Sequence, residues 1–261
     1  MTDLAHSPVK DAAALRRAAR ALTPARIGLG RTGVSLETRD LLDFQQAHAL
    51  ARDAVHARLD PSSVAASLAG IVRGEVLILH SAAPDRTAYL QRPDLGRKLD
   101  GPSRELLTQH PLTLPSPEPE FDLAPIVVDG LSALAVERHA APLIAELLPH
   151  LGGWRLAPLC VVEQGRVAIG DEIGAAMRAQ AVIVLIGERP GLSSPDSLGA
   201  YITWAPQPGR TDAERNCVSN IRTDGLSYAL AAAQIAAILA QARRFRLTGV
   251  ALKTGTNRIE A

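Results

Sequence analysis

The chain has 261 residues, of which 47% are hydrophobic and 3% aromatic, and its formal charge at pH 7 is +1. This composition predicts a globular protein of one or two domains. Nucleic acid is not an expected partner, because the charges balance and aromatic side chains for base stacking are scarce. A membrane is not an expected partner either, because the apolar runs are far shorter than the roughly 20 residues of a membrane span. The chain has only two cysteines, Cys160 and Cys217, which is too few for a disulfide framework. Its N-terminus lacks the basic segment followed by an apolar one that marks a secreted protein, so a cytoplasmic protein is predicted.

A helical extension is predicted over residues 1–22. Residues 9–22 are rich in strong helix formers, and Thr23-Pro24 ends the run because the residue before a proline disfavours the helical conformation. From Ser35 toward Leu59 a stronger helix is predicted, since a set of largely apolar side chains recurs there at helical spacing. These residues are Leu41, Phe44, Ala47, His48, Ala51 and Val55.

Residues 23–115 are predicted to form a mainly helical N-terminal domain with one strand. A short helix is expected over residues 62–69, a strand over Glu75–Ser81, and a loop from Ala82 to Gly96. The prolines that follow are dense enough to forbid regular structure and to mark a linker or domain boundary. They are Pro111, Pro115, Pro117, Pro119 and Pro125.

Residues 116–261 are predicted to form an α/β domain of the Rossmann-like or flavodoxin-like type, which is doubly wound around a largely parallel sheet. Apolar runs alternate with helical stretches at 132–148, 171–180 and 227–246, which is typical of a parallel sheet covered on both faces. The runs are Ile126–Val128, Leu159–Val162, Arg166–Ile169, Ala181–Ile186, Tyr201–Trp204 and Gly249–Leu252.

Two segments with the same pattern, Asp129-Gly-Leu-Ser132 and Asp224-Gly-Leu-Ser227, predict junctions between a strand and a helix. In each, the glycine permits a turn and the serine can accept a hydrogen bond from the free N–H groups of the next helix. Open α/β sheets bind their ligands at such junctions, so a capping role and a ligand-binding role both stay open.

The segment Gly28-Leu-Gly-Arg-Thr-Gly33 matches the dinucleotide fingerprint, with Gly28, Gly30 and Gly33 at its glycine positions. A dinucleotide-dependent oxidoreductase is therefore one alternative. The context disfavours it, because Thr23–Ile27 does not supply the buried strand that should come first, and Asp53 at the expected acidic position would lie within a helix.

Other catalytic or metal-binding patterns are weak. His48 and His56 are eight residues apart on one predicted helix, about 12 Å along its axis, which is too far for two ligands of one metal. We expect them to be ordinary, partly buried histidines. Cys217 has no evident histidine partner, which favours a packed or ligand-contacting thiol over a nucleophile.

The run Ala181–Leu192 predicts a loop that faces a ligand. Its apolar strand delivers Glu188 and Arg189 onto a turn that Pro190 and Gly191 enforce. A carboxylate directly after a buried strand is costly unless a donor satisfies it, so either Arg189 or a ligand must do so.

Several segments in a fixed order resemble the small subunit of ethanolamine ammonia-lyase. They are Leu42–Phe44 with Ala47-His48, Asp85–Gly96, Asp129–Ser132, Gly165–Gly174, Ala181–Leu192 and Arg215–Ile221. The resemblance implies that adenosylcobalamin lies between this chain and a large (β/α)₈-barrel subunit in a higher-order hetero-oligomer. It further implies that the barrel carries the substrate site for converting ethanolamine to acetaldehyde and ammonia.

The resemblance implies that Val167, Glu188 and Cys217 contact the cofactor, and that this chain holds no catalytic residue and no metal ligand. An ionised Glu188 suits the amide-rimmed corrin, because charge-assisted hydrogen bonds are the stronger kind. The resemblance also implies that the cobalamin stays base-on. The sequence agrees, because Leu148 stands two residues before His150 where a cobalt-binding motif would have an aspartate. We expect the loop Asp85–Gly96 to contact the large subunit, and a bacterial microcompartment is a candidate location. A purely structural subunit stays a second alternative.

Overall fold

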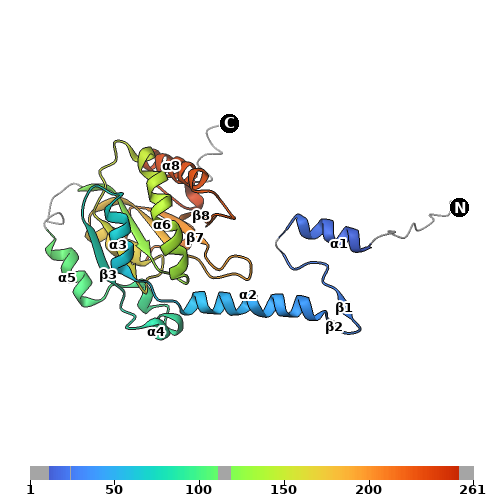
Figure 1. The fold of residues 1–261 in the computed structure, drawn as a ribbon. Helices are drawn as coiled ribbons and strands as arrows, with labels where there is room; N and C mark the ends of the chain where they lie inside the picture. Colours follow the sequence, from blue (N-terminus) through green and yellow to red (C-terminus); the bar gives the residue numbers. More distant parts are fainter. Residues whose placement is uncertain (1–11, 24, 111–118, 253–261) are drawn as a thin grey trace.

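A six-stranded sheet organises the molecule, of which the computed structural model describes residues 12–23, 25–110 and 119–252 (Figure 1). The strand order is β3-β5-β4-β6-β7-β8. The strands are β3 (Val76–His80), β4 (Phe121–Val128), β5 (Leu159–Glu163), β6 (Ala179–Gly187), β7 (Leu198–Trp204) and β8 (Asn216–Ile221). The first four strands of this order run parallel, and β7 and β8 join antiparallel. The predicted α/β fold with a largely parallel sheet is confirmed.

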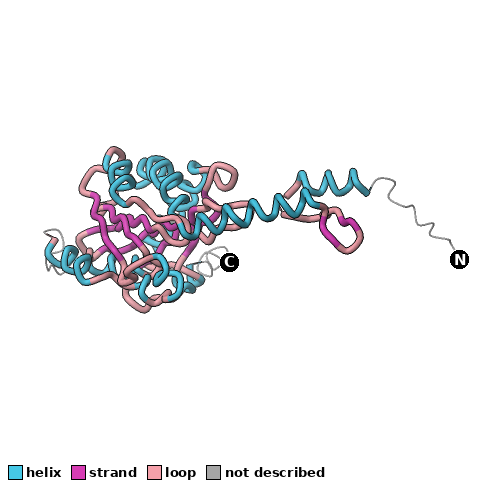
Figure 2. Tube along the Cα trace, turned by 60° about the horizontal axis from the view of Figure 1, so that its bottom comes forward, coloured by secondary structure: helices cyan, strands magenta, loops and turns pink. Residues whose placement is uncertain are grey.

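Helices cover both faces of the sheet (Figure 2). One face packs against α3 (Pro61–Ala69), α6 (Ala133–Leu147) and α8 (Tyr228–Phe245), and the other against α5 (Gly101–Gln109) and α7 (Ile169–Ala176). Strand β6 serves both layers, because Ile183 and Leu185 enter the first core while Val182 and Val184 enter the second. This two-sided burial explains why β6 is a continuous apolar run rather than an alternating one.

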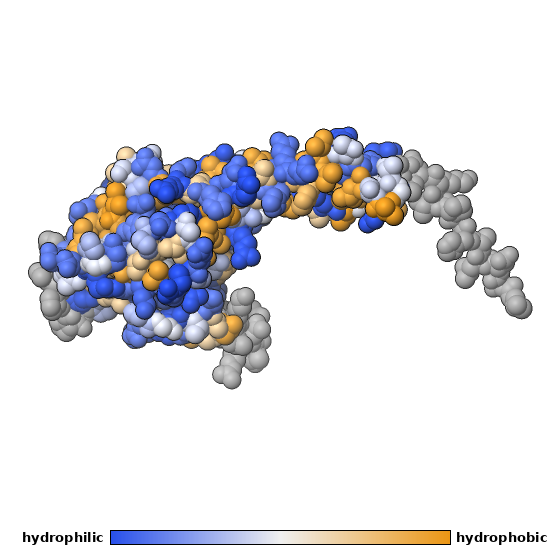
Figure 3. All heavy atoms as spheres, turned by 90° about the horizontal axis from the view of Figure 1, so that it is seen from below, coloured by the Kyte–Doolittle hydropathy of each residue, from blue (hydrophilic) through white to orange (hydrophobic). Residues whose placement is uncertain are grey.

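The N-terminal segments project from this body as an arm, which we define as residues 12–56 (Figures 1 and 3). It consists of α1 (Ala12–Ala21), a small hairpin of β1 (Arg31–Thr32) and β2 (Ser35–Leu36), and α2 (Thr38–His56). The predicted apolar stripe of α2 is buried only toward its end, at Ala51, whereas Leu41 and Phe44 are 41% and 40% exposed. The pattern correctly indicated a helix, but most of the helix leaves the core.

The fingerprint glycines lie within the arm. Strand β1 begins inside the motif at Arg31, and Gly33, with φ of +64°, lies in the turn of the hairpin. The described residues provide no buried strand before the motif. The context that a dinucleotide site requires is therefore missing, and the oxidoreductase alternative loses its structural basis.

Several local predictions were wrong. Residues Arg166–Ile169 form a turn that enters α7 instead of a strand, and residues 250–252 are helical. Strand β8 was not predicted. The expected loop Ala82–Gly96 contains α4 (Arg86–Gln91) and the start of the short helix η1 (Leu95–Arg97), and α5 follows it.

The proline-rich segment is only partly regular. Residues 111–118 lie outside the described part of the chain, but Pro125 lies within β4, so the prolines do not exclude a strand there. The β4–β5 ladder has an irregularity at this point, between the bridge Leu123↔Leu156 and the pair Ile126↔Cys160, and such a site tolerates proline. Since β3 belongs to the same sheet as the later strands, the segment before residue 115 contributes to the α/β body. The division of the chain into domains stays a prediction.

Candidate functional site

The loops that follow the parallel strands gather at the carboxyl edge of the sheet, where open α/β folds bind ligands. Glu188 directly follows β6, and Val167 lies in the turn between β5 and α7. Cys217 comes from β8, a strand that runs antiparallel to its neighbour β7. The sequence-predicted residues thus come from three different elements.

The Glu188 carboxylate is held by neighbouring protein donors. The Ser197 hydroxyl and the Asn220 N–H, the latter at 3.2 Å, both donate to Oε2. Arg189 does not form this contact, so the expectation that Arg189 or a ligand must satisfy the carboxylate is corrected. No described residue donates a hydrogen bond to Oε1, which leaves Glu188 an acceptor for a ligand.

Glu188 lies across the surface of β7. A Cβ atom placed on Gly199 would be only 2.8 Å from Oε1 of Glu188. Gly199 therefore gives the carboxylate the room to fold over the strand. Since residues 199 and 201 share one face of β7, Glu188 lies on the same face of the sheet as Tyr201.

Tyr201 pairs with Cys217 on the face where Glu188 lies. Tyr201 and Cys217 are directly opposite in the β7–β8 ladder, and their hydroxyl and thiol are hydrogen-bond partners. Although the residue is exposed, partial loss of hydration around its thiol and the nearby Glu188 carboxylate raise the pKa of Cys217. The thiol is therefore protonated at neutral pH, and it fits a contact role better than a nucleophilic one.

Val167 lies on the same face of the sheet as Tyr201. Its half-buried side chain packs, as Tyr201 does, against the apolar core beneath α7. The Val167 carbonyl accepts the Gly170 N–H at 3.1 Å as α7 begins, so this backbone group already has one partner. Tyr201 and Cys217 are hydrogen-bond partners, and the Glu188 carboxylate is near enough to both to raise their pKa values, whereas Val167 shares the underlying core with Tyr201.

Close backbone packing fixes the point where Glu188 leaves the sheet. A Cβ atom on Gly187 would lie 2.1 Å from the Ser132 carbonyl oxygen, and one on Gly130 would lie 2.3 Å from the Gly187 carbonyl oxygen. The Ser132 hydroxyl caps α6 by accepting the Ala135 N–H at 3.3 Å, and it donates to the Pro195 carbonyl at 2.9 Å. The capping prediction for Ser132 is confirmed, and the same residue supports the Glu188 loop.

Two buried ion pairs support these loops, and sequence reasoning missed both. Arg86 contacts Asp129 at 3.2 Å, and Asp129 also accepts the Gly165 N–H at 3.1 Å. Burial raises the pKa of Asp129 to about 6. The signal for the first pair lay in two segments that the sequence analysis had singled out, because Arg86 follows the N-cap Asp85 and Asp129 directly follows β4.

The second pair joins the start of β8 to α7. Arg215 binds Asp171 through two bonds of 2.7 Å and also donates to Thr203 at 2.9 Å. Both side chains of the pair are almost fully buried. The pair anchors the strand that carries Cys217 beside the helix that follows Val167.

Histidines and acidic groups do not form a metal centre in the described residues. His48 and His56 are exposed on α2, which corrects the expectation that they are partly buried. His150 is exposed in η3 (Leu148–Leu151), at the end of α6 away from the carboxyl edge. In the described part of the chain, no helix has the length and apolar character that crossing a membrane requires.

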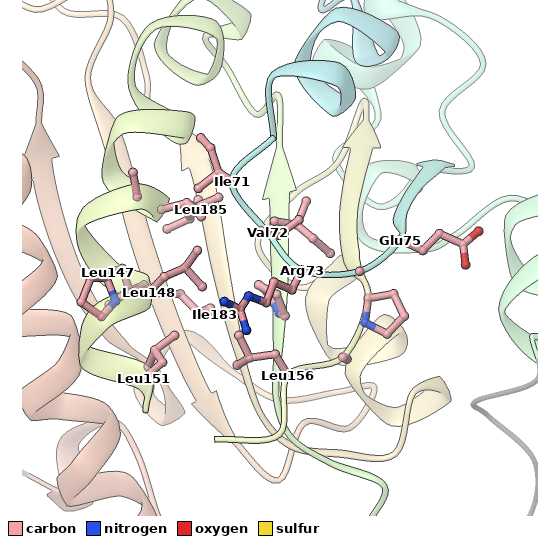
Figure 4. A pocket seen from close by; sticks show the side chains of 18 residues that line it. Ile71, Val72, Arg73, Glu75, Leu147, Leu148, Leu151, Leu156, Ile183 and Leu185 are labelled. Carbon is pink, nitrogen blue, oxygen red and sulfur yellow. The ribbon is translucent and has the colours of Figure 1, made fainter. Parts of the chain in front are cut away.

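An apolar cavity of about 600 Å³ lies at the opposite end of the sheet (Figure 4). Its walls include Ile71, Leu148, Leu156 and Leu185, and Arg73 reaches across it. None of the sequence-predicted site residues lines this cavity. The predicted site residues therefore lie apart from the apolar cavity, toward the carboxyl edge of the sheet.

Known proteins match the chain over nearly its whole length. The family model described as the ethanolamine ammonia-lyase light chain matches residues 13–253. A small subunit of ethanolamine ammonia-lyase from Ralstonia nicotianae is 56% identical over 240 residues, which cover 91% of this chain and 87% of that protein. The small subunits from Pseudomonas paraeruginosa and Xanthomonas campestris are also 56% identical, over 90% and 92% of this chain and 85% and 87% of their own lengths.

Proposed function

The chain belongs to the ethanolamine ammonia-lyase light-chain family, and we propose that it forms one wall of an adenosylcobalamin site that the family's large subunit closes. In this proposal the complex converts ethanolamine to acetaldehyde and ammonia, and the large subunit carries the substrate site. The observation that carries the proposal is the convergence of Glu188, Cys217 and Val167 on one face of the sheet.

The chemistry of this face suits a corrin ring. A corrin is broad and flat, and its rim carries primary amides whose N–H groups need acceptors. Glu188 offers an ionised carboxylate with an oxygen that no described residue uses, and such an acceptor makes strong hydrogen bonds. Val167 and Tyr201 supply apolar surface beside it.

This chain's residues bind and orient rather than react. When bound, adenosylcobalamin supplies the homolysis of its cobalt–carbon bond, which is the difficult chemical step. Glu188 holds the corrin rim, Cys217 and Val167 contact it, and the apolar surface excludes water. His150 lies at the other end of the fold, which supports a base-on cofactor without a histidine ligand from this chain.

The arm supports the expectation of a protein partner. Large apolar side chains along it remain exposed, among them Val34 at 93% and Leu42 at 57%. Exposed apolar surface on this scale is typical of a protein interface. The segment Asp85–Gly96 stays a predicted contact, as do the higher-order hetero-oligomer, the cytoplasmic location and encapsulation in a bacterial microcompartment.

Glu188→Gln tests the cofactor role. The amide keeps the shape of the side chain but removes its charge, so we expect the affinity of the reconstituted two-subunit complex for cyanocobalamin to fall by about tenfold. Equilibrium dialysis measures this affinity, and urea unfolding of the variant chain should match the wild type. The control is Glu137→Gln, an exposed acid of α6, which should change neither quantity.

An unchanged cyanocobalamin affinity in Glu188→Gln would contradict the cofactor role. It would favour the purely structural alternative, in which the chain contacts the large subunit but no part of the corrin. Saturable binding of a nicotinamide or flavin dinucleotide to the isolated chain would instead revive the oxidoreductase alternative.

A further inference from the structure

A pocket of about 580 Å³ lies between α2 and the loop that follows Glu188. Five basic or imidazole side chains line it, and the remaining lining residues are apolar or glycine. The five are His48, Arg52, His56, Arg166 and Arg189. No described Asp or Glu lines the pocket.

The geometry of α2 aligns three of these groups. His48, Arg52 and His56 are spaced at i, i+4 and i+8, so they form a row of about 12 Å along one side of the helix. Arg166 and Arg189 come from two separate loops of the carboxyl edge. The Arg86 side chain donates to the Val55 carbonyl at 2.7 Å and so holds this end of α2 to the body. The pocket therefore has a fixed wall.

The pocket's cations are incompletely neutralised by the protein. Arg52 approaches only Asp53, at 3.8 Å and with both side chains exposed, and such a pair is weak. Arg166 donates to the Tyr89 carbonyl at 3.2 Å and stacks over the Tyr89 ring. Its buried Nε has no hydrogen-bond partner among the described residues. Arg189 forms no ion pair within the same part of the chain.

We propose that this pocket binds a phosphate group. Guanidinium groups match phosphate oxygens with paired, charge-assisted hydrogen bonds, and a concave site lined by one sign of charge concentrates the opposite ion. A row in which Arg52 lies between two imidazole groups, facing two further arginines, also offers several hydrogen-bond donors to a tetrahedral anion. Free inorganic phosphate is one source of this group.

The second source is the phosphodiester of the cobalamin nucleotide loop, and this part rests on the function proposed above. Arg166 and Arg189 directly adjoin Val167 and Glu188 in the sequence. A cofactor that contacts those two residues therefore lies beside the pocket. Arg166 and Arg189 would then bind a part of the cofactor that the corrin contacts leave unassigned.

The double substitution Arg52→Ala/Arg189→Ala tests the proposal in the reconstituted two-subunit complex. Both side chains are exposed at their tips, so the fold should be retained. Equilibrium dialysis compares cyanocobalamin with dicyanocobinamide, which lacks the nucleotide loop and its phosphate. Calorimetry measures saturable binding of inorganic phosphate. The control is Arg73→Ala, which removes an exposed arginine at the far cavity.

If the cofactor phosphodiester occupies the pocket, the double variant loses affinity for cyanocobalamin by a factor on the order of tenfold or more and keeps its affinity for dicyanocobinamide. If free phosphate occupies it, both corrinoid affinities persist and the saturable phosphate binding disappears. Either result supports the proposal.

The proposal is overturned if the variant matches the wild type toward cyanocobalamin, dicyanocobinamide and phosphate. It is also overturned if only the affinity for the large subunit falls, because acidic residues of that subunit would then be the occupant. Failure of the wild-type complex to bind either corrinoid would contradict the proposed function instead. The calorimetric measurement would still show whether the pocket binds phosphate.

Discussion

Apolar side chains are buried in the sheet body but exposed in the arm. In the body, Leu143 of α6 is fully buried and β6 is almost completely enclosed. In the arm, Leu50 and Phe44 are 54% and 40% exposed although they lie on a regular amphipathic helix. The body therefore buries its apolar side chains within the chain, whereas the arm leaves many of its own exposed.

Ion pairs show the same difference. Arg215 and Asp171 are 2% and 1% exposed and share two short bonds, whereas Arg20 and Asp40 of the arm are 41% and 12% exposed and 3.5 Å apart. The comparison teaches that the body pairs its charges in the interior, whereas the arm pairs them at its surface. Substitutions in matched positions can test this distinction.

The largest effect is expected from Arg215→Ala. Removing the guanidinium leaves the buried Asp171 without its partner, which should lower the free energy of unfolding by about 3–5 kcal/mol. Arg20→Ala, at the exposed pair, should lower it by less than about 1 kcal/mol. Urea unfolding of the isolated chain measures both.

If Arg215→Ala does not fold, the double variant Arg215→Met/Asp171→Leu provides the measurement. It removes both charges together and should be more stable than the single variant. If Arg215→Ala and Arg20→Ala lower the free energy of unfolding by equal amounts, burial does not distinguish the ion pairs of the two regions.

A pair of leucine substitutions should give the next largest effect. Leu143→Ala creates a cavity in the core and should lower the free energy of unfolding of the isolated chain by about 3 kcal/mol. Leu50→Ala should lower it by less than about 1 kcal/mol, because that side chain is already half in water. A pull-down titration should then show weaker association of Leu50→Ala with the large subunit. If Leu50→Ala associates with the large subunit as the wild type does, this part of the arm does not contribute to the interface.

The smallest effect concerns pH. Burial raises the pKa of Asp129 to about 6, above the ordinary value of about 3.9 in an unfolded chain. The folded state therefore binds the proton more tightly, and the resulting stability is present below about pH 4 and is lost as the pH rises through about 6. Relative to Asp129→Asn, which cannot titrate, the wild type should gain stability as the pH falls from 7 toward 4. A difference in unfolding free energy that does not vary across this range would argue against the raised pKa.

The sequence predicted the parts of the fold whose patterns are set by burial. Strands β3, β5 and β6 are short apolar runs between turn residues, and α6 and α8 follow capping serines. Strand β8 was missed because it lies at the sheet edge and alternates buried residues with exposed Cys217 and Ser219. The run Arg166–Ile169 was misassigned because four residues are too few to separate a strand from the first turn of a helix.

Two helices had local signals that were not used. Asp85 and Asp100 each cap the helix that follows, and Pro102 lies in the first turn of α5. An aspartate before such a segment indicates a helix start. The exposure of α2 could not be predicted, because an apolar stripe looks the same whether it faces the chain's own core or another protein.

The candidate site was predicted only as separate segments. The sequence indicated Glu188, Val167 and Cys217, but it did not show that Tyr201 pairs with Cys217 or that Ser197 donates a hydrogen bond to the Glu188 carboxylate. These contacts depend on the antiparallel pairing of β7 with β6, which no single-strand pattern reveals. The basic pocket was likewise hidden, because its residues come from α2 and two distant loops.

The backbone contact between Gly187 and Ser132 separates what can change in this site from what cannot. No side chain fits at position 187, so the direction of the next residue is set by main-chain atoms alone. At position 188, by contrast, the side chain lies over Gly199 and accepts hydrogen bonds from Ser197 and Asn220. A substitution at position 188 therefore changes the chemistry at the tip of β6, whereas a substitution at position 187 changes its direction.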